Sequence, residues 1–356
     1  MDHKLKFALV GCGRIAKRHA DLLSSGQIAG AELVAVCDTL DTRALDFSKK
    51  YSVPFFLDMD EMMVSANPDV VVVLTESGNH AKHVINLSKY GKHIVVEKPM
   101  ALTLGDADEM ILACQRKGIN LFVVKQNRFN LPVVKLREAL EEGKFGKLVL
   151  GTVRVRWCRP QAYYDQDSWR GTWALDGGVL SNQASHHVDL LHWMMGDISS
   201  VFAKSENALA KIEAEDTAVV IVKFENGALG VIEATTATRP RDIEGSLSIL
   251  GERGMVEVGG FAVNKINHWC FLGDEELPEL LKEYSENPPN VYGFGHKSYY
   301  EHVVNCLKNK ASILVDGYEG KRSLELITAI YQSIETKEEV YLKNGIESNR
   351  LGRSGI

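Results

Sequence analysis

The 356-residue sequence is poor in the features that mark membrane, nucleic-acid-binding and disulfide-stabilised proteins. Its longest purely aliphatic run, from Val70 to Leu74, is far too short to cross a bilayer. Basic residues are not in excess, since 41 Lys and Arg face 47 Asp and Glu, which argues against a nucleic-acid partner. The six cysteines form no C-x-x-C pair, so neither a zinc site nor a disulfide framework is expected. We therefore expect a cytoplasmic protein with no metal and no membrane or nucleic-acid partner.

The first part of the sequence has the pattern of an α/β domain. Hydrophobic residues make up 45% of the chain and charged residues 25%, which is typical of a globular protein, and the length indicates two domains. Short apolar runs alternate with helical patterns, as in a parallel sheet covered by helices on both faces. We expect a doubly wound Rossmann sheet with strands at 6–11, 33–38, 54–57, 69–74, 93–97 and 120–125.

The pattern changes after about residue 130, where half-exposed strands begin. Residues 148–157 alternate between apolar and polar, and Glu225-Asn226-Gly227 joins two β-rich runs in a hairpin pattern. Helices are expected at 132–142, 178–195, 296–308 and 320–333. We predict an NAD-binding domain over 1–126 and an α+β domain with a large, mainly antiparallel sheet over 127–356, which binds substrate and mediates oligomerisation.

A glycine-rich turn follows the first expected strand. Residues 11–16 fit G-x-G-x-x-A, in which Gly11 permits a tight turn and Gly13 lets the backbone approach a pyrophosphate. Asp38 ends the second strand, where a carboxylate can accept both ribose hydroxyls of an adenosine and repel a 2′-phosphate. The pattern predicts NAD as cofactor, although the nearby Arg43 leaves NADP open.

Two further segments carry residues suited to proton handling. Lys98 follows an apolar strand and precedes Pro99, at the edge where a doubly wound sheet binds ligands. Asn182, His186 and Asp189 would lie on one face of the expected helix at 178–195, so that Asn182 orients an alcohol, His186 accepts its proton and Asp189 holds the imidazole ring. A surface Glu97–Lys98 pair and a structural His–Asp pair are the alternatives.

Together these motifs resemble the Gfo/Idh/MocA oxidoreductase family. The resemblance rests on the glycine turn, on Glu97-Lys98-Pro99 and on the Gly-Gly segment followed by His186-x-x-Asp189. It covers about residues 6–342 and implies Lys98 and His186 as the catalytic pair, with Asn182 beside them. Segments 124–128, 157–173, 182–186 and 291–296 are similar to bacterial dehydrogenases of UDP-N-acetylglucosaminuronic acid, which oxidise the sugar 3-hydroxyl for lipopolysaccharide O-antigen synthesis, before a partner aminotransferase acts.

By this resemblance, NAD is expected to contact Gly11, Gly13, Arg14, Ile15, Asp38, Thr75, Ser77, His80, Glu97, Lys98 and Gln126. The substrate is expected to contact Lys98, Asn127, Arg128, Arg159, Tyr164, Trp169, Arg170, Asn182, Gln183, His186 and His296. A homodimer or homotetramer is also implied. This chain departs from the family by having Asn182 where many members have Asp, and Glu76 in place of the proline of T-P-x-x-x-H.

An anionic nucleotide sugar also fits the local residue types. Cations are dense in the segments expected near the ligand: Lys125, Arg128, Arg156, Arg159 and Arg170. Tyr163, Tyr164, Trp169 and Trp173 could supply flat faces for a uracil or sugar ring. An inositol or free-sugar dehydrogenase, an NAD-dependent glycoside hydrolase of the same fold and an NAD-sensing regulator remain the alternative functions.

Overall fold

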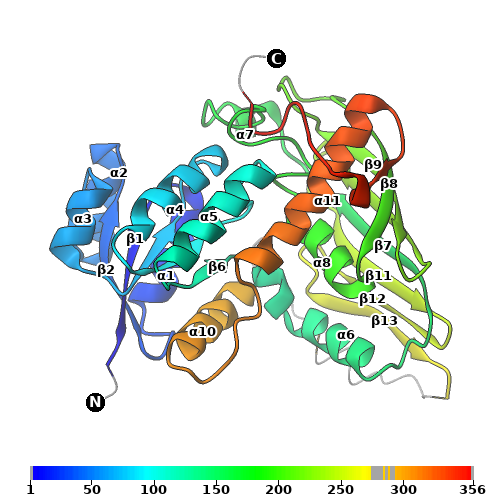
Figure 1. The fold of residues 1–356 in the computed structure, drawn as a ribbon, viewed down its shortest axis with the longest axis horizontal. Coiled ribbons are helices and arrows are strands. Elements are labelled where there is room, and N and C mark those ends of the chain that lie inside the picture. The colour runs from blue at the N-terminus through cyan, green and yellow to red at the C-terminus, as the bar shows by residue number, and fades with distance from the viewer. Residues whose placement is uncertain (1–2, 274–283, 285–287, 289–292, 354–356) are drawn as a thin grey trace. The chain divides into compact units, whose positions relative to one another are not determined.

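The computed structural model describes residues 3–273, 284, 288 and 293–353, so Val291 and Tyr292 of the motif at 291–296 lie outside the described residues. The chain divides into two compact units, which are described separately (Figure 1). Unit 1 comprises residues up to 101, 105–124 and 296–321, and unit 2 comprises 102–104, 125–295 and residues from 322 onward.

Unit 1 is the expected Rossmann sheet. Its six strands are all parallel and lie in the order β3-β2-β1-β4-β5-β6. Their bounds are β1 (Leu5–Val10), β2 (Ala31–Cys37), β3 (Phe55–Phe56), β4 (Val70–Val73), β5 (His93–Val96) and β6 (Leu121–Val123). The four valines of β4 are completely buried because helices cover both faces of the sheet.

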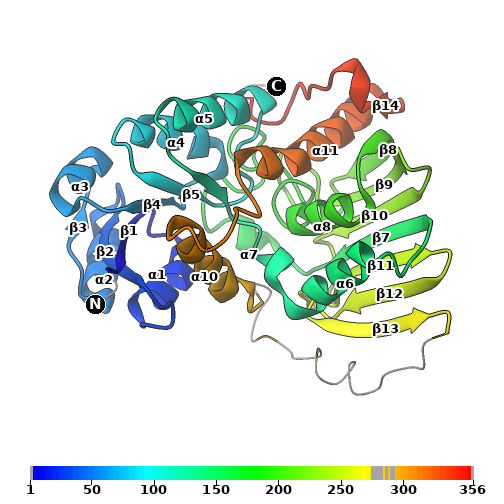
Figure 2. The ribbon, with the colours of Figure 1, turned by 60° about the horizontal axis from the view of Figure 1, so that its bottom comes forward.

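The helices of unit 1 follow the strands as expected, with one addition from the distant C-terminal part. They are α1 (Arg14–Ser24), α2 (Asp41–Tyr51), α3 (Met59–Ala66), η1 (Ser77–Asn79), α4 (His80–Ser88), α5 (Leu104–Arg116) and α10 (Gly295–Leu307). The sequence assigned 296–321 to the second domain, but α10 packs beside α1 in unit 1 (Figure 2), where the ring of Tyr300 lies 5.7 Å from that of Phe7. Helical periodicity shows that a segment has an apolar face but not which sheet covers that face.

Unit 2 contains an eight-stranded sheet in the order β13-β12-β11-β7-β10-β9-β8-β14. Its strands are β7 (Leu148–Arg156), β8 (Ile198–Glu206), β9 (Thr217–Phe224), β10 (Leu229–Thr235), β11 (Glu244–Gly251), β12 (Gly254–Gly259), β13 (Lys265–Phe271) and β14 (Val340–Tyr341). Every pairing is antiparallel except β7 with β10. The predicted hairpin joins β9 to β10, and Gly227 has the positive φ of +89° that its turn requires.

Helices cover one face of this sheet (Figure 2). Unit 2 contains η2 (Gln126–Phe129), α6 (Leu131–Glu141), α7 (Gln161–Tyr164), α8 (Ser185–Met195), α11 (Gly317–Thr336) and η3 (Leu342–Asn344). The helix expected over 178–195 begins only at Ser185, so Asn182 precedes it and does not share its face. Residues 178–184 form turns instead, in which the backbone oxygen and the carboxylate of Glu215 accept the amide protons of Val179 and Leu180. In the described part of the chain, none of the helices is long and apolar enough to cross a bilayer.

Candidate functional site

The candidate cofactor residues of unit 1 gather at one edge of its sheet. Gly11, Asp38, Thr75 and Glu97 follow β1, β2, β4 and β5 closely along the chain. These strands are neighbours in the order β2-β1-β4-β5 and are parallel, so the loops after their carboxyl ends meet. The chain adds β2 and β3 on one side of β1 and β4 to β6 on the other. The switch between β1 and β4 makes this edge the ligand-binding crevice of a doubly wound sheet.

The glycine turn has the geometry that a pyrophosphate needs. Gly11 has a φ of +98°, and a Cβ there would lie 2.8 Å from the carbonyl carbon and oxygen of Leu74, so no other residue fits. Gly13 caps α1, and no heavy atom of the described chain lies within 4 Å of where its Cβ would be. This space lies at the N-terminus of α1, where a helix can bind an anion, so the turn fits the phosphates of NAD.

Asp38 lies against this turn. Its Oδ2 accepts the amide proton of Cys12 at 2.8 Å, and its Oδ1 accepts that of Leu40 at 2.8 Å. Each carboxylate oxygen can accept a second hydrogen bond. The carboxylate is thus held in place and can still accept the ribose hydroxyls of an adenosine, which agrees with the prediction of NAD.

The loop after β4 is braced by two histidines. His83 Nδ1 lies 2.9 Å from Thr75 Oγ1, and His80 lies between the carbonyl oxygens of Pro99 (2.8 Å from Nδ1) and Thr75 (3.1 Å from Nε2). Burial lowers the pKa of His80, against the opposing effect of these carbonyls. Glu76, which replaces the family's proline, accepts the side-chain amide of Asn79 at 3.1 Å and so stabilises the turn η1 that contains the buried Ser77.

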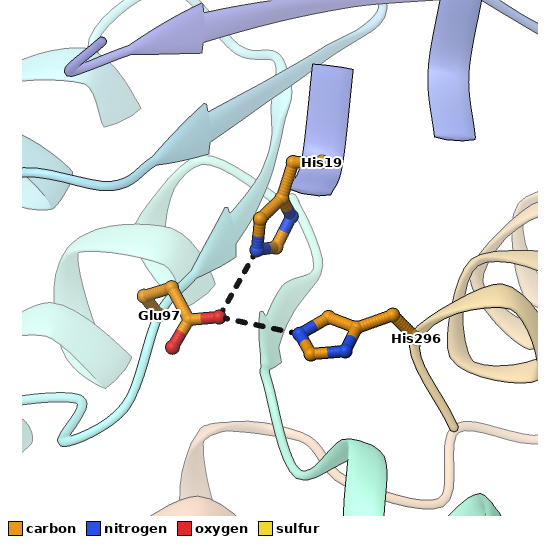
Figure 3. Close-up of side chains that lie close together, drawn as sticks. All are labelled: His19, Glu97 and His296. Carbon is orange, nitrogen blue, oxygen red and sulfur yellow. Dashed lines mark hydrogen bonds and ion pairs between the residues drawn. The ribbon is translucent and has the colours of Figure 1, made fainter. Parts of the chain in front are cut away.

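Glu97 and His296, predicted as a cofactor and a substrate contact, lie together inside unit 1 (Figure 3). Glu97 Oε1 lies 3.1 Å from His19 Nε2 and 3.9 Å from His296 Nε2, and both histidines are completely buried. The three side chains bring possible metal-ligand atoms within 4.8 Å of one another. Burial raises the pKa of Glu97, but its bonds with His19 and His296 outweigh this and hold the pKa well below its usual value.

The predicted catalytic residues of unit 2 adjoin a buried ion pair. Arg128 donates to both oxygens of Asp189, at 2.8 and 2.9 Å, and the ammonium group of Lys125 lies 3.5 Å from the same carboxylate. Burial raises the pKa of Asp189, but the charges of Arg128 and Lys125 bring it well below its usual value. Asp189 was expected to hold the ring of His186; its carboxylate is instead paired with two buried cations, both of which were expected near the ligand.

His186 and Asn182 are each bonded to a side chain of unit 2. The side-chain amide of Gln126 donates to His186 Nε2 at 2.9 Å, which requires a neutral ring with its lone pair on that nitrogen. Asn182 Nδ2 donates to Asp176 Oδ1 at 2.5 Å, and Asp176 Oδ2 accepts the amide proton of Gly171. His186 Nε2 is thus engaged by Gln126, and Asn182 is held in a fixed orientation by Asp176.

The Gly177-Gly178 segment owes its second glycine to Glu215. A Cβ on Gly178 would lie 2.2 Å from the carboxylate carbon of Glu215. That carboxylate is buried and its Oε1 accepts the hydroxyl proton of Tyr331 at 2.9 Å and the Leu180 amide proton at 3.0 Å. Burial raises the pKa of Glu215 to about 7. A carboxyl group that is neutral over much of the physiological range therefore supports the turn that leads to Asn182.

Stacked guanidinium and aromatic groups follow β7. Arg170 lies 4.6 Å from the ring centre of Trp169 and 4.8 Å from that of Tyr163, and Arg159 lies 5.4 Å from the same tyrosine ring. The side-chain amide of Gln183 donates to the Tyr163 hydroxyl at 3.5 Å. These five side chains, Arg159, Tyr163, Trp169, Arg170 and Gln183, are called the arginine–aromatic cluster.

The remaining expected contacts lie in different surroundings. Tyr164 is buried with its hydroxyl 2.9 Å from that of Thr236, and burial raises its pKa to about 12. Asn127 is also buried. Arg156 was expected near the ligand, but it is bonded to Glu233 and Glu244 on the face of the sheet that no helix of the described residues covers, called here the helix-free face. Residues alternate between faces along β7, so Arg156 falls on the face opposite Val155.

Four residues that support these sites were not found from the sequence: His19, Asp176, Glu215 and Tyr300. His19 could have been suspected, because a histidine in the first helix after a glycine turn is an unusual core residue. The other three belong to segments whose neighbours are set by tertiary packing, and no local pattern marks them.

Two family models match the chain. The model described as "Oxidoreductase family, NAD-binding Rossmann fold" matches residues 5–125, and "Oxidoreductase family, C-terminal alpha/beta domain" matches residues 137–342; both are Gfo/Idh/MocA models. The N-terminal match confirms the predicted NAD cofactor, in agreement with the open glycine turn and the position of Asp38.

Similar proteins include sugar and polyol dehydrogenases. The WlbA dehydrogenase of Bordetella pertussis, solved in complex with NADH and UDP-GlcNAcA, is 42% identical with a TM-score of 0.91 over 96% of this chain and 98% of that one. WlbA of Chromobacterium violaceum, with the same ligands, is 42% identical with a TM-score of 0.90 over 96% of both chains. Myo-inositol 2-dehydrogenase of Thermotoga maritima is 29% identical over 96% of this chain and all of its own.

The raised pKa of Glu215 predicts a pH dependence of stability. The folded-state pKa of Glu215 is about 7, above the unfolded value near 4.5. The stability that its protonated form contributes is therefore complete below about pH 4.5 and is lost as the pH rises through 7. The free energy of unfolding, measured by urea denaturation, should fall by up to about 3 kcal/mol between pH 5 and 8 because of this group. Glu215→Gln should remove that part of the slope, whereas the exposed Glu225→Gln should keep it. An unchanged slope in Glu215→Gln would show that Glu215 is ionised.

Proposed function

Because the chain belongs to the Gfo/Idh/MocA oxidoreductase family, we propose that it oxidises the 3-hydroxyl of UDP-N-acetylglucosaminuronic acid to the 3-keto sugar, with NAD as the oxidant. The family, together with relatives such as the D-glucoside 3-dehydrogenase of Escherichia coli, makes the protein an NAD-dependent sugar or polyol dehydrogenase. The specific substrate rests on one observation, the 42% identity over 96% of the chain with two WlbA enzymes that bind UDP-GlcNAcA.

The cofactor is proposed to bind mainly to residues of unit 1. The first amides of α1 and the turn at Gly11 and Gly13 would bind the pyrophosphate, and Asp38 the adenosine ribose. Arg14, Ile15, Thr75, Ser77, His80 and Lys98 of unit 1 and Gln126 of unit 2 complete the proposed contact set. Glu97, also expected in this set, is buried with one oxygen at His19 and the other at the Lys98 amide. The nicotinamide, when bound, supplies the hydride acceptor.

Lys98 and His186 are the proposed proton-handling residues. Lys98 follows β5 at the ligand edge of the sheet, and its ammonium group would stabilise the oxygen that becomes negative as the hydroxyl proton leaves. His186 Nε2 lies 2.9 Å from the side-chain amide of Gln126, so it could accept the hydroxyl proton when the substrate hydroxyl takes the place of that amide at Nε2. Asn182, fixed by Asp176, would orient the hydroxyl. Many family members have an aspartate at this position, and an amide cannot replace it as a base.

The arginine–aromatic cluster is the proposed recognition site for the anionic sugar nucleotide. Its guanidinium groups can donate paired hydrogen bonds to a carboxylate or phosphate, and its rings can stack on a uracil or sugar. Asn127, Arg128, Tyr164 and His296 were also expected at the substrate; all four are buried, so we propose that they shape the site rather than face solvent.

The helix-free face of the unit 2 sheet is the proposed self-association surface. It exposes apolar side chains on adjacent strands, with Val219 and Ile221 of β9 51% and 55% exposed and Leu229 of β10 48% exposed. Beside them lies the ion-pair network of Arg154 and Arg156 with Glu233 and Glu244. We propose a homodimer or homotetramer in the cytoplasm, whose keto product passes to an aminotransferase in O-antigen synthesis.

The proposed substrate can be tested by NADH formation, measured at 340 nm. UDP-N-acetylglucosaminuronic acid should be oxidised with a kcat/KM at least 100-fold above that of UDP-N-acetylglucosamine and of myo-inositol, because a carboxylate that pairs with arginine contributes several kcal/mol. A preference for myo-inositol would refute the sugar-nucleotide proposal and leave a polyol dehydrogenase. Release of free sugar from an aryl glycoside without net NADH would indicate the hydrolase instead.

The proposed catalytic roles predict that Lys98→Ala and His186→Ala lower kcat by roughly 100- to 10,000-fold, because each removes a group that acts on the hydroxyl proton. The dissociation constant for NADH, measured by NADH fluorescence, should change far less than kcat, since Lys98 is one of many proposed cofactor contacts and neither side chain is assigned to the phosphate loop. Lys89→Ala, an exposed lysine of unit 1, is the matched control. Turnover like that of the wild type in both variants would rule out the assignment.

The proposed self-association surface predicts that Val219→Glu with Ile221→Glu lowers the molar mass in solution, because like charges would be buried against a second copy. Light scattering after size-exclusion chromatography measures the mass directly. Leu57→Glu, which alters an apolar residue that is 47% exposed in unit 1, should leave the mass unchanged. A multimer that survives the double substitution would place the interface elsewhere.

A further inference from the structure

We propose that His19, Glu97, His296 and Tyr300, called here the Glu97 cluster, form a buried positioning device for Lys98. The inference rests on the proposed role of Lys98 and assigns Glu97 and His296 a function different from the ligand contacts expected of them. The side chains come from three elements, α1, the end of β5 and α10. His19, Glu97 and His296 converge in the interior of unit 1 (Figure 3), and the hydroxyl of Tyr300 lies 2.6 Å from His19 Nδ1.

The bonds of Glu97 lead directly to the backbone of Lys98. Glu97 Oε2 accepts the Lys98 amide proton at 2.9 Å, while Oε1 faces His19 Nε2 at 3.1 Å. The carboxylate therefore uses one oxygen for the lysine and the other for a histidine. Beyond Lys98, the carbonyl oxygen of Pro99 is held by His80 Nδ1 at 2.8 Å. The backbone on both sides of Lys98 is thus bonded to a buried side chain.

The histidines in turn fix Glu97. A neutral His19 satisfies both of its contacts, since Nε2–H donates to Glu97 and Nδ1 accepts the hydroxyl proton of Tyr300, 2.6 Å away. The ring of His296 crosses that of His19 nearly at right angles, with centroids 5.3 Å apart, and places Nε2 3.9 Å from Glu97 Oε1. A Tyr–His–Glu chain of this kind orients a group through its partner, as in catalytic triads.

The cluster also joins the two functional parts of unit 1. His19 lies on α1, whose first turn forms the proposed pyrophosphate site, and Glu97 precedes Lys98 on the chain. Movement of α1 would be transmitted through a buried bond to the backbone of the lysine. His19 and His296 have no exposed surface, so both rings are enclosed by packed neighbours. The position of α10 in unit 1, which the sequence did not predict, is what supplies His296 and Tyr300.

Three substitutions and one control test this role. Glu97→Gln leaves one oxygen acceptor where the native side chain uses two, His296→Gln removes the second ring, and Tyr300→Phe deletes only the hydroxyl that contacts His19. His302→Gln, on the same helix α10 but bonded to the Leu314 amide, is the matched control. Circular dichroism shows which variants fold, and NADH fluorescence shows which bind the cofactor. If Glu97→Gln or His296→Gln fails to fold, Tyr300→Phe, the smallest change, still tests the proposal.

We expect kcat to fall roughly 10- to 100-fold in Glu97→Gln and His296→Gln, because a small misplacement of a catalytic group has effects of that size. Tyr300→Phe should show a smaller fall, and His302→Gln none. The KM values and the NADH dissociation constant should stay within about threefold of the wild type, since a positioning residue touches neither ligand. A raised KM with unchanged kcat would mean that His296 contacts a ligand directly, and unchanged kinetics in all variants would mean a purely structural cluster. Either result overturns the proposal.

Two further measurements separate this proposal from its alternatives. Zinc bound stoichiometrically to the purified protein, measured by plasma mass spectrometry and lost in His296→Gln, would replace the positioning role with a metal centre. If the wild type oxidises none of the sugars, the proposed function fails, and acylation of Lys98 followed by peptide mass spectrometry decides the cluster. Lys98 should then react at least about threefold faster in Glu97→Gln, because its backbone is freed and a nearby negative charge is lost. Equal rates in Glu97→Gln, His302→Gln and the wild type would overturn the proposal.

Discussion

The constraint on which the rest of unit 1 depends is that its six strands are parallel and buried. Parallel strands put all their carboxyl ends at one edge, so the loops after β1, β2, β4 and β5 must share that edge. Space there is tight, as the 2.8 Å between a hypothetical Cβ on Gly11 and the Leu74 carbonyl shows. One edge of the sheet therefore holds the glycine turn, Asp38, the loop at Thr75 and Lys98. A displacement of one of these loops would shift its neighbour.

Three buried carboxyl groups show how the surroundings determine charge. Asp189 is bonded to Arg128 and lies near Lys125, and Glu97 is bonded to a histidine, so both are held as carboxylates. Glu215 receives only a hydroxyl and an amide proton on Oε1, and burial raises its pKa to about 7. The first two fix buried cationic or polar partners, whereas Glu215 packs against Gly178 and supports a turn. Residue type alone would have assigned all three the same charge.

The sequence predicted the elements well, because burial on one or both faces leaves a periodic pattern. All six Rossmann strands and the hairpin at Gly227 were found in this way. It did not predict which element meets which. The helix expected from Gly178 begins only at Ser185, after turns that are bonded to the distant Glu215, and α10 returns to unit 1 through contacts far apart in the chain. The glycine turn and Asp38 were recognisable because their chemistry is local, while the partners of Asp189 and Glu97 come from tertiary packing.

The same distinction applies to the charges that the sequence placed near an anionic ligand. Lys125 and Arg128 share the single negative charge of Asp189, Arg159 is paired with Asp242 at 2.9 Å, and Arg170 with Asp167 at 3.2 Å. Four cations therefore face three carboxylates, so excess positive charge alone is a weak source of affinity for a diphosphate. What remains is directional: a guanidinium keeps further N–H donors after pairing once, and its flat face stacks on Trp169 or Tyr163. Recognition by such groups depends on planar, paired geometry, which a lysine at the same positions could not reproduce and which net charge does not reveal.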